Sequence, residues 1–334
     1  MIRESLSKLF NKQDLTKLEA KETMDEIMSG SVSDILLSSY LTALRMKGET
    51  IDEIIGSAMS LREKCVKLNH DFETFEIVGT GGDKTNTFNI SSISSFVIAS
   101  TGIKVSKHGN RSVSSKCGTA DFLEKIGVNI NCSVEKNEEA LKEIGICFMF
   151  AQKYHGAMKY AGPVRKELKE RTIFNILGPL ANPAFATYQL LGVYSKDLVK
   201  PLAKVLQGLG VKRGMVVYGD GMDEITASGI TNVAEITDSG IIEYDIDPRD
   251  YGINICKKED LEGGNPDDNV LIAKDIFNGV KGPKRDVVVL NAAAGIHICN
   301  PNITIKEAIK IAEDAIDSKK ALEKLNLLIK KTGE

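Results

Sequence analysis

Hydrophobic residues recur at three- and four-residue steps through the first 68 residues, the spacing typical of one face of an α-helix. In DLTKLEAKETMDEIM the apolar positions of this face are Leu15, Leu18, Met24, Ile27 and Met28. The stretch SDILLSSYLTALRMKG has the same spacing and ends at Gly48, as helices commonly do. A third helix is predicted from Thr50, which has capping-box spacing with Glu53. The chain is therefore expected to begin with a small α-helical domain over residues 1–70.

From about residue 72, short β-rich runs alternate with helical stretches. The predicted strands are FEIVG, IKVS, ICFMFA, YQLLGVY, GMVVYG and, after Arg285, DVVVL; helices are predicted near 90–100, 119–126, 156–169 and 197–209. This alternation predicts parallel strands joined by crossover helices. The run TNVAEITDSGIIEYDID predicts a hairpin around Asp238-Ser239-Gly240. The C-terminal run IKEAIKIAEDAIDSKKALEKLNLLIKK predicts one or two amphipathic helices.

The expected fold class is α/β, with a small all-helical N-terminal domain beside a larger α/β domain at 71–334. The hairpin makes the central sheet mixed, although mainly parallel, and helices should flank it. The segment RTIFNILGPLANP at 171–183 fits neither domain, because a Gly-Pro and an Asn-Pro pair interrupt it and its apolar residues require burial. We expect a crossing segment near 160–185 to complete the small domain. The length of 334 residues agrees with two domains.

Composition narrows the class of protein. A formal net charge of -3 argues against nucleic-acid binding, which usually needs a basic excess or a basic face. The six cysteines stand singly, without the spacing of a zinc site or a disulfide framework, and predict reduced thiols. The first residues, MIRESLSKLFNKQDL, lack a signal-peptide core, and no window has about 18 consecutive apolar residues. We therefore expect a cytoplasmic protein that does not enter a membrane.

Three loops that follow predicted strands carry unusual chemistry, and ligands of open parallel sheets bind at the carboxyl ends of strands. The first loop is Gly79-Thr-Gly-Gly-Asp83, followed by hydroxyl and amide side chains as far as Ser92. Its glycines let backbone N–H groups approach an anion, and a helix opening near Asn89 would point its N-terminus at the same place. The loop has neither the P-loop spacing nor GxGxxG. The alternative is a tight strand-to-helix turn.

The second loop, KHGNRSVSSKCGTAD at 107–121, is dense in hydrogen-bond donors and poor in fixed negative charge. Such a set suits a ligand with many phosphate oxygens. The alternative is a solvated surface loop, the usual position of polar glycine-containing segments. The donors are Lys107, His108, Asn110, Arg111, Ser112, Ser114, Ser115 and Lys116.

The third loop, YGDGMDE, places Asp223 beside Glu224 with no base nearby in sequence. Two carboxylates of this kind suit Mg2+, which is typically held by one or two carboxylates together with substrate phosphates. The alternative is a charged turn. Taken together, the three loops predict a phosphate-rich substrate that binds with a metal ion, and a reaction in which a phosphate group leaves or is transferred.

The stretches VGTGGDKTNTFNIS, KHGNRSVSSKCGTADFLEKIGV, VRKELKERTIFNILGPLANP and DGMDEIT occur in this order. With them the chain resembles the anthranilate phosphoribosyltransferase family over essentially its whole length. GTGGD and a KHG-type loop are shared with pyrimidine nucleoside phosphorylases, whereas the other motifs are more specific. The resemblance implies transfer of the phosphoribosyl group of 5-phosphoribosyl 1-pyrophosphate to anthranilate in tryptophan biosynthesis. It also implies the two-domain fold, Mg2+ as cofactor and a homodimer.

The resemblance also assigns roles to residues. Anthranilate would be bound by Gly79, His108, Asn110 and Arg165, of which Arg165 would face its carboxylate. The Mg2+ ligands would be Ser91, Asp223 and Glu224. The residues that would bind phosphoribosyl pyrophosphate are Gly79, Gly82, Asp83, Thr87, Asn89, Ile90, Ser91, Ser92, Lys107, His108, Gly109, Asn110, Arg111, Ser112, Val113, Ser114, Ser115 and Thr119. Helix spacing alone predicts that Arg165 is a basic residue on the protein surface.

Four positions depart from the commonest family pattern. Thr119 stands where serine is usual, Tyr218 where histidine is frequent, and Gly156 and Gly162 where proline and a bulkier residue are expected. Gly156 and Gly162 lie near the expected anthranilate-binding side. This departure therefore affects the expected details of anthranilate entry and not the class of reaction. Two other functions stay open: a nucleoside phosphorylase, in which the acidic pair would have little purpose, and a non-catalytic nucleic-acid-binding paralogue, which the net charge of -3 disfavours.

Overall fold

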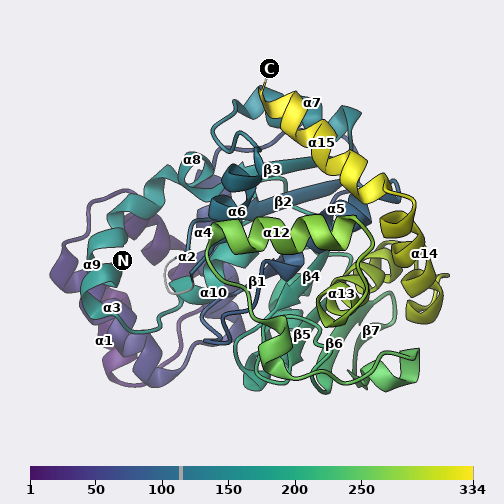
Figure 1. Ribbon diagram of the computed structural model, residues 1–334. Helices are drawn as coiled ribbons and strands as arrows, with labels where there is room; N and C mark the ends of the chain where they lie inside the picture. The colour runs from purple at the N-terminus through teal and green to yellow at the C-terminus, as the bar shows by residue number, and fades with distance from the viewer. Residues whose placement is uncertain (113–115, 334) are drawn as a thin grey trace.

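The computed structural model describes residues 1–112 and 116–333 of the chain. A group of helices at the N-terminal end lies beside a sheet that is covered by further helices (Figure 1). The N-terminal group consists of α1 (Ile2–Phe10), α2 (Lys17–Met28), α3 (Asp34–Lys47) and α4 (Ile51–Lys64). The predicted helical beginning of the chain is confirmed.

The ends of these helices follow the predicted capping chemistry. Thr50 and Glu53 form both hydrogen bonds of a capping box at the start of α4. Gly48 ends α3 with a φ of 88°, which a glycine adopts without a steric penalty. One expected core position was wrong, because Leu18 is 62% exposed. It precedes the buried Ala20 by two positions, about 200° around the helix, and so lies on the opposite side of α2.

Seven strands form a single sheet in the order β3-β2-β1-β4-β5-β6-β7. Neighbours from β3 to β5 pair in parallel, whereas β6 pairs antiparallel with both β5 and β7. The strands are β1 (Phe75–Gly79), β2 (Val105–Gly109), β3 (Ile146–Phe150), β4 (Tyr188–Gly192), β5 (Arg213–Gly219), β6 (Thr231–Thr237) and β7 (Gly240–Ile246). The mixed, mainly parallel sheet and its terminal hairpin are confirmed.

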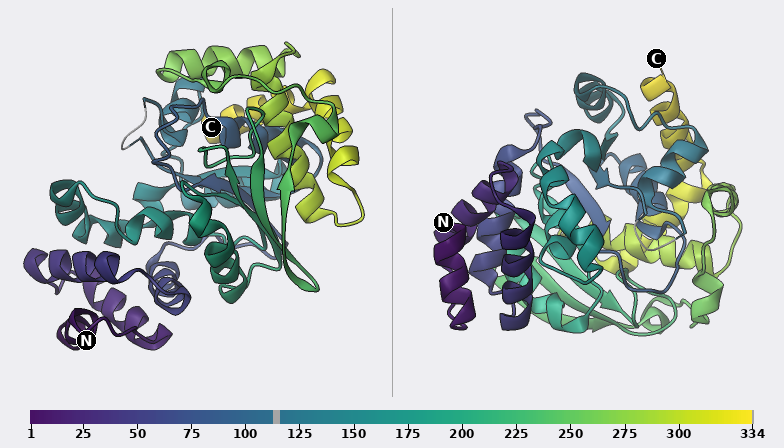
Figure 2. Two further views of the ribbon diagram at one scale, coloured as in Figure 1. Left: turned by 90° about the horizontal axis from the view of Figure 1, so that it is seen from below. Right: turned by 90° about the vertical axis from the view of Figure 1, so that its left-hand side faces the viewer.

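Helices cover both faces of the sheet, as the view from below in Figure 2 makes clear. One core gathers side chains of α5 (Ile90–Ser100), α6 (Thr119–Ile126), α7 (Val134–Glu143), α12 (Pro266–Phe277), α13 (Pro283–Cys299), α14 (Ile305–Asp317) and α15 (Lys320–Gly333). A second core joins α11 (Val199–Gly208) to the N-terminal helices. Short 3-10 helices are η2 (Lys196–Leu198), η3 (Pro248–Tyr251) and η4 (Lys258–Leu261).

Two predicted elements were wrong. The run DVVVL after Arg285 is part of α13, which is buried on almost every side, and not a strand. A fully buried helix needs consecutive apolar residues, so its sequence cannot be told from that of a buried strand by periodicity. The helix expected at 156–169 is divided into η1 (Gly156–Tyr160) and α9 (Gly162–Leu168). Pro163 explains the division, because proline favours the first turn of a new helix.

The segment after α8 (Ala151–Tyr154) packs on the N-terminal helices. In it, η1 contacts α2, α9 contacts α3, and α10 (Phe174–Leu180) contacts α4. We propose that the small domain comprises residues 1–70 completed by the segment near 160–185, and that the large domain spans 71–334. None of the helices within residues 1–112 and 116–333 is long and apolar enough to cross a membrane.

A polar cluster lies between β6 and α13, away from the three loops. His297 Nε2 lies 3.3 Å from Glu235 Oε1, and the Tyr244 hydroxyl donates to Glu235 Oε2 at 2.8 Å. The hydrogen bond with Glu235 raises the pKa of His297 above its ordinary value. Burial alone would raise the pKa of Glu235, but the hydrogen bonds from His297 and Tyr244 outweigh it and the pKa is lowered. The cluster therefore holds an ion pair whose strength depends on pH.

We expect His297→Gln to reduce the free energy of unfolding by about 1–2 kcal/mol at pH 6 and by less at pH 9. Because the pKa of His297 is raised in the folded protein, its contribution is present below the unfolded pKa of about 6.5. It is lost as the pH rises through the folded value. Urea unfolding at both pH values measures the difference, with His70→Gln as the control. Equal losses at the two pH values would contradict the ion pair.

Candidate active site

The loop with the acidic pair rests on the carboxyl ends of three strands. A Cβ on Gly192, at the end of β4, would overlap the backbone carbonyl of Asp223. A Cβ on Gly79, at the end of β1, would overlap the carboxylate of the same residue. Gly219, at the end of β5, packs in the same way against the carbonyl oxygen of Glu224. These glycines therefore let the acidic loop come into contact with the loop that follows β1.

We expect Gly192→Ala to lower the free energy of unfolding by about 1–3 kcal/mol, because the added methyl group has no room beside the Asp223 backbone. Gly162→Ala is the matched control, since a Cβ there meets nothing within 4 Å. Urea unfolding of both variants tests the close approach. A Gly192→Ala protein as stable as the control would show that the acidic loop does not lie against β4.

Both carboxylates of the acidic loop are buried, with Asp223 8% and Glu224 9% exposed. Asp223 Oδ2 accepts a hydrogen bond from the Gly81 N–H at 2.6 Å, and Glu224 Oε1 accepts one from the Ser91 N–H at 3.2 Å. Burial raises the pKa of Asp223 and repulsion from Asp83 raises it further. Burial also raises the pKa of Glu224, as does the charge of Asp223. The pair therefore favours a cation beside it.

The acidic pair alone supplies only part of a metal coordination shell. Among the residues that the structure describes, no group of three or more His, Cys, Asp or Glu side chains is arranged to hold a metal ion. Asp223 and Glu224 are nevertheless hard oxygen ligands, and a bound cation would favour their ionised forms. Ser91, the third predicted ligand, lies next to Glu224 through its N–H. The set fits Mg2+ when substrate phosphates complete the coordination.

Lys107 reaches this place from β2. Its side chain is only 2% exposed, and Nζ donates to the carbonyl oxygen of Ile77 at 2.5 Å and to Ser91 Oγ at 3.2 Å. Burial lowers the pKa of Lys107, while the charges of nearby carboxylates oppose that change. The structure thus brings together the predicted lysine of the second loop, the first turn of α5 and the acidic pair. An anionic group bound here would have a buried ammonium group beside it.

The first loop has the open backbone expected of an anion-binding turn. Gly81 and Gly82 have φ values of 68° and 74°, and α5 begins directly after its N-cap residue, Asn89. The predicted residues Ile90, Ser91 and Ser92 form the first turn of that helix, where the Ile90 N–H donates to the carbonyl oxygen of Phe88 and the Ser91 N–H to Glu224 Oε1. The helix dipole favours an anion at this end of α5.

The other predicted residues of this loop make contacts within the chain. The Asp83 carboxylate accepts hydrogen bonds from the N–H and the hydroxyl of Thr85, at 3.2 and 2.5 Å. Thr87 pairs with Glu262 in an isolated β-bridge. The first loop is thus held by the hydrogen bonds of Asp83 inside the loop and by the β-bridge to Glu262, in the segment that precedes α12.

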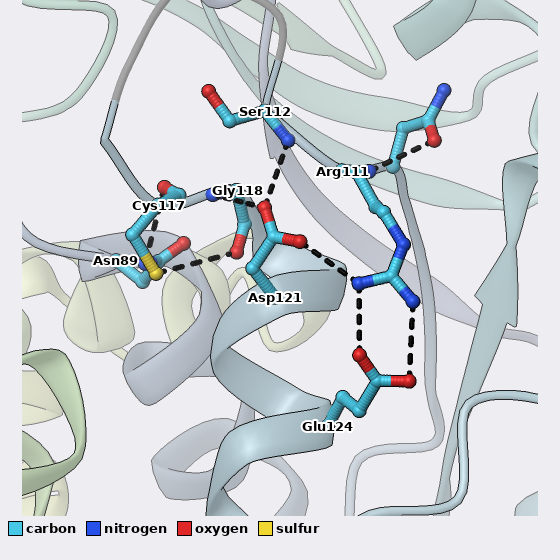
Figure 3. Close-up of polar contacts among 8 residues, drawn as sticks. Asn89, Arg111, Ser112, Cys117, Gly118, Asp121 and Glu124 are labelled. Atoms are coloured by element: carbon cyan, nitrogen blue, oxygen red, sulfur yellow. Dashed lines mark hydrogen bonds and ion pairs between the residues drawn. The ribbon is translucent and has the colours of Figure 1, made fainter. Parts of the chain in front are cut away.

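The second loop is shown in Figure 3, where Arg111 points toward two carboxylates of α6, those of Asp121 and Glu124. Thr119 lies on the first turn of α6, and its hydroxyl accepts a hydrogen bond from the Ser92 hydroxyl at 3.4 Å. The first two loops therefore meet at these hydroxyl groups. The predicted ligands Val113, Ser114 and Ser115 lie outside the residues that the structure describes.

Two buried histidines lie together next to Gly109, which ends β2. The rings of His108 and His155 are 5.0 Å apart between centres, and the Nε2 atom of each has no hydrogen-bond partner within the described residues. Burial lowers the pKa of both, that of His155 to about 4, so both rings are neutral near pH 7. The predicted Arg165 contacts a different group, the ring of Phe174, whose centre lies 5.3 Å from its guanidinium carbon.

The chain is similar to known proteins over most of its length. The description "Glycosyl transferase family, helical bundle domain" matches residues 3–65, and "Glycosyl transferase family, a/b domain" matches residues 72–322. An anthranilate phosphoribosyltransferase of Lachnoclostridium phytofermentans is 58% identical over 330 residues, which cover 98% of this chain and 98% of that protein. The chain belongs to the anthranilate phosphoribosyltransferase family.

Solved structures of this family have the same fold. The anthranilate phosphoribosyltransferase of Thermus thermophilus has a TM-score of 0.94 and 37% identity, covering 99% of both chains. The Saccharomyces cerevisiae enzyme in complex with PRPP and Mg has a TM-score of 0.92 and 25% identity, covering 99% of this chain and 98% of that one. The likeness extends over both matched domains.

Two residues that contact the first loop were assigned no role from the sequence. Arg171 donates through Nη2 to the carbonyl oxygen of Gly82, and its guanidinium carbon lies 4.1 Å from the ring centre of Tyr194. Asn269 Oδ1 accepts from the N–H of Asn89 at 2.9 Å and from its Nδ2 at 3.1 Å. Both come from distant parts of the chain, so only the folded structure shows them beside the first loop.

Proposed function

We propose that the protein transfers the phosphoribosyl group of 5-phosphoribosyl 1-pyrophosphate to anthranilate, giving N-(5-phosphoribosyl)anthranilate and pyrophosphate. This is a glycosyltransferase reaction of tryptophan biosynthesis. The observation that carries the proposal is the meeting of Lys107, the first turn of α5 and the pair Asp223 and Glu224 at one edge of the sheet. Full-length similarity to anthranilate phosphoribosyltransferases supports it further.

The amine nitrogen of anthranilate would attack the anomeric carbon of the ribose. As the new C–N bond forms, the bond from that carbon to the pyrophosphate oxygen breaks, and its electron pair leaves with pyrophosphate. The amine then loses a proton. An arylamine has a free lone pair at neutral pH and needs no base before it attacks, so we assign no general base. Positioning of the two substrates and stabilisation of the leaving group would supply the rate gain.

The proposed site residues form two groups: one would bind the pyrophosphate that leaves, and the other would bind anthranilate, the acceptor. Asp223 and Glu224, with Ser91 and substrate phosphates, would hold Mg2+, which would offset the charge of pyrophosphate. Lys107 would place its ammonium group beside the same phosphates. The amides and hydroxyls of the first two loops would complete phosphate binding; the residues proposed for this are Gly79, Gly82, Asp83, Thr87, Asn89, Ile90, Ser91, Ser92, Gly109, Asn110, Ser112 and Thr119.

Anthranilate would lie on the side of the two neutral histidines. His108 is 5% exposed, and its Nε2 atom, like that of His155, has no partner among the described residues and can hydrogen-bond to a polar group without adding charge. Gly79, Asn110 and Arg165 complete the proposed acceptor site. Burial lowers the pKa of Arg165, but a guanidinium group stays charged and can pair with the carboxylate of the acceptor.

We further propose a homodimer that works in the cytoplasm. Ile35 and Met46 are 79% and 82% exposed, and eleven positions separate them on α3, which puts both on the same side of that helix. Phe10, at the end of the neighbouring α1, is 68% exposed. A second copy would cover this apolar surface. The six cysteines are all free thiols, in agreement with a reducing compartment.

Measuring the amounts of both products distinguishes the proposed reaction from that of a nucleoside phosphorylase. The purified protein is incubated with anthranilate, phosphoribosyl pyrophosphate and Mg2+, and both products are measured by mass spectrometry. We expect one pyrophosphate for each phosphoribosylanthranilate, and no base released from nucleosides in the presence of phosphate. Release of a pyrimidine base from its nucleoside, without the first reaction, would assign the protein to the phosphorylases instead.

A further inference from the structure

The two ends of the second loop touch each other. The Ala120 N–H donates to the carbonyl oxygen of Asn110 at 3.1 Å. A Cβ on Gly118 would overlap the backbone nitrogen of Ser112 and the carbonyl carbon of Arg111. The chain that leaves β2 and the chain that enters α6 therefore pass each other at backbone contact distance. We call this place, residues 110–112 and 118–120, the neck of the second loop.

One carboxylate joins the two sides of the neck. Asp121 Oδ2 accepts hydrogen bonds from the N–H of Ser112 on one side and from the N–H of Gly118 on the other, both at 3.0 Å (Figure 3). Burial would raise the pKa of Asp121, but these two N–H groups and the Arg111 guanidinium outweigh it and lower the pKa. Asp121 is therefore ionised near neutral pH, and its hydrogen bonds are of the stronger, charge-assisted kind.

Arg111 fixes that carboxylate from the other side. Its Nη1 atom donates to Asp121 Oδ1 at 2.9 Å and to Glu124 Oε2 at 2.8 Å, while Nη2 donates to Glu124 Oε1 at 3.1 Å. Its guanidinium carbon also lies 5.5 Å from the ring centre of Phe150, at the end of β3. The planar guanidinium thus bridges two carboxylates one turn apart on α6, with little freedom to rotate.

Cys117, the residue directly before the neck residue Gly118, joins the second loop to the first. Asn89, the N-cap residue of α5, donates through Nδ2 to Cys117 Sγ at 3.3 Å and to the Cys117 carbonyl oxygen at 3.5 Å (Figure 3). The same amide group donates to Asn269 of α12. A change in the neck would therefore alter the distance between the second loop and the helix N-terminus proposed to bind phosphate.

We propose that Arg111, Asp121 and Glu124 form a positioning unit, the neck clasp, that sets the affinity for the pyrophosphate-bearing substrate. Arg111 would act through Asp121 and not as a phosphate ligand, although its sequence position first suggested a direct contact. This inference rests on the proposed function, since it concerns the same phosphate site. Asp121 and Glu124 have no part in that site other than through the clasp.

The kinetic test uses Asp121→Asn, Arg111→Gln, Glu124→Gln and the double variant of Asp121 and Arg111. We expect each single change to raise the KM for phosphoribosyl pyrophosphate roughly tenfold while kcat and the KM for anthranilate stay within about twofold. Lys125→Gln is the matched control, because it removes an ion pair of the same helix, with Asp267 at 2.9 Å, that does not reach the neck. Arg111→Lys, which keeps one ion pair, should restore part of the affinity.

The double variant decides between positioning and direct contact. If Arg111 acts through Asp121, the double variant will be no worse than Asp121→Asn alone. If the two effects on KM multiply, Arg111 contacts the substrate and the positioning role is overturned. A kcat that falls as far as the KM rises would also overturn it, since the clasp would then serve the chemical step.

Hydrogen exchange provides a readout that needs no substrate. In Asp121→Asn without ligand, the peptides that carry the Ser112 and Gly118 amides should exchange roughly tenfold faster than in the wild type and in Lys125→Gln. Unchanged exchange would contradict the clasp itself. Should the wild-type protein fail to convert anthranilate, the proposed function would be lost, whereas the exchange measurement would still show whether the clasp holds the neck.

Discussion

Replacement of Asp223 by Asn together with Glu224 by Gln is expected to lower kcat/KM for phosphoribosyl pyrophosphate by roughly 10²–10³-fold. The two carboxylates are the charged oxygen ligands proposed for Mg2+. Both are buried; Glu224 lies beside the first turn of α5 and Asp223 beside Gly81. Their amide counterparts keep the size of the side chains but bind a divalent cation weakly. The initial rate is measured as a function of Mg2+ concentration, and the variant should need far more Mg2+ for half-maximal activity.

The matched control is Asp220→Asn together with Asp245→Asn. Asp220 lies in the same loop but contacts Ser228 and Lys258, and Asp245 lies on β7. This variant removes the same number of carboxylates and should keep its dependence on Mg2+. If the double variant of Asp223 and Glu224 is fully folded and responds to Mg2+ like the wild type, the metal does not bind at the acidic pair.

Lys107→Met is expected to lower kcat/KM for phosphoribosyl pyrophosphate roughly 100-fold and also to lower the temperature of thermal unfolding. Lys107 is 2% exposed, and its ammonium group contacts Ser91, in the turn proposed to bind the phosphates. Because the ammonium group faces the buried carboxylates of Glu76, Glu224 and Asp223, its removal leaves these charges without compensation and should destabilise the folded state. Steady-state kinetics and thermal unfolding of the same preparation separate the two effects.

An exposed lysine provides the comparison for this variant. Lys306→Met on α14 makes the same chemical change on the surface of the large domain and should affect neither activity nor unfolding. If Lys107→Met loses its fold, the lysine is needed mainly for stability. If it keeps both fold and full activity, the ammonium group does not assist the leaving pyrophosphate.

Structural features that depend on residues close together in the sequence could be predicted. Gly48 and the capping box at Thr50 define the ends of two helices through local geometry, and the hairpin around Ser239 follows from its turn residues. The first loop was equally local, since its glycines and the N-terminus of α5 are adjacent in sequence. Strand alternation placed the three loops at one edge, which is why their complementary chemistry could be combined.

Features that depend on tertiary packing were not predictable in the same way. The β-branched run of α13 resembles a strand because a helix buried on all sides has no polar face to reveal its period. Leu18 fits an apolar pattern by spacing, yet α2 buries a different side. Arg171 and His155 had no role assigned from the sequence, and only the fold brings them to Gly82 and His108. The sequence predicts Arg111 as a phosphate donor, whereas the structure shows its guanidinium between two carboxylates.

The most direct test of the proposed function is the fluorescence of anthranilate in a mixture with the purified protein, phosphoribosyl pyrophosphate and Mg2+. Each component is omitted in turn, and Mg2+ is added last. We predict that the fluorescence falls only when all three are present with the protein, and that the fall stops when either substrate is exhausted. Constant fluorescence in the complete mixture, from a protein shown to be folded, would contradict the proposed transfer.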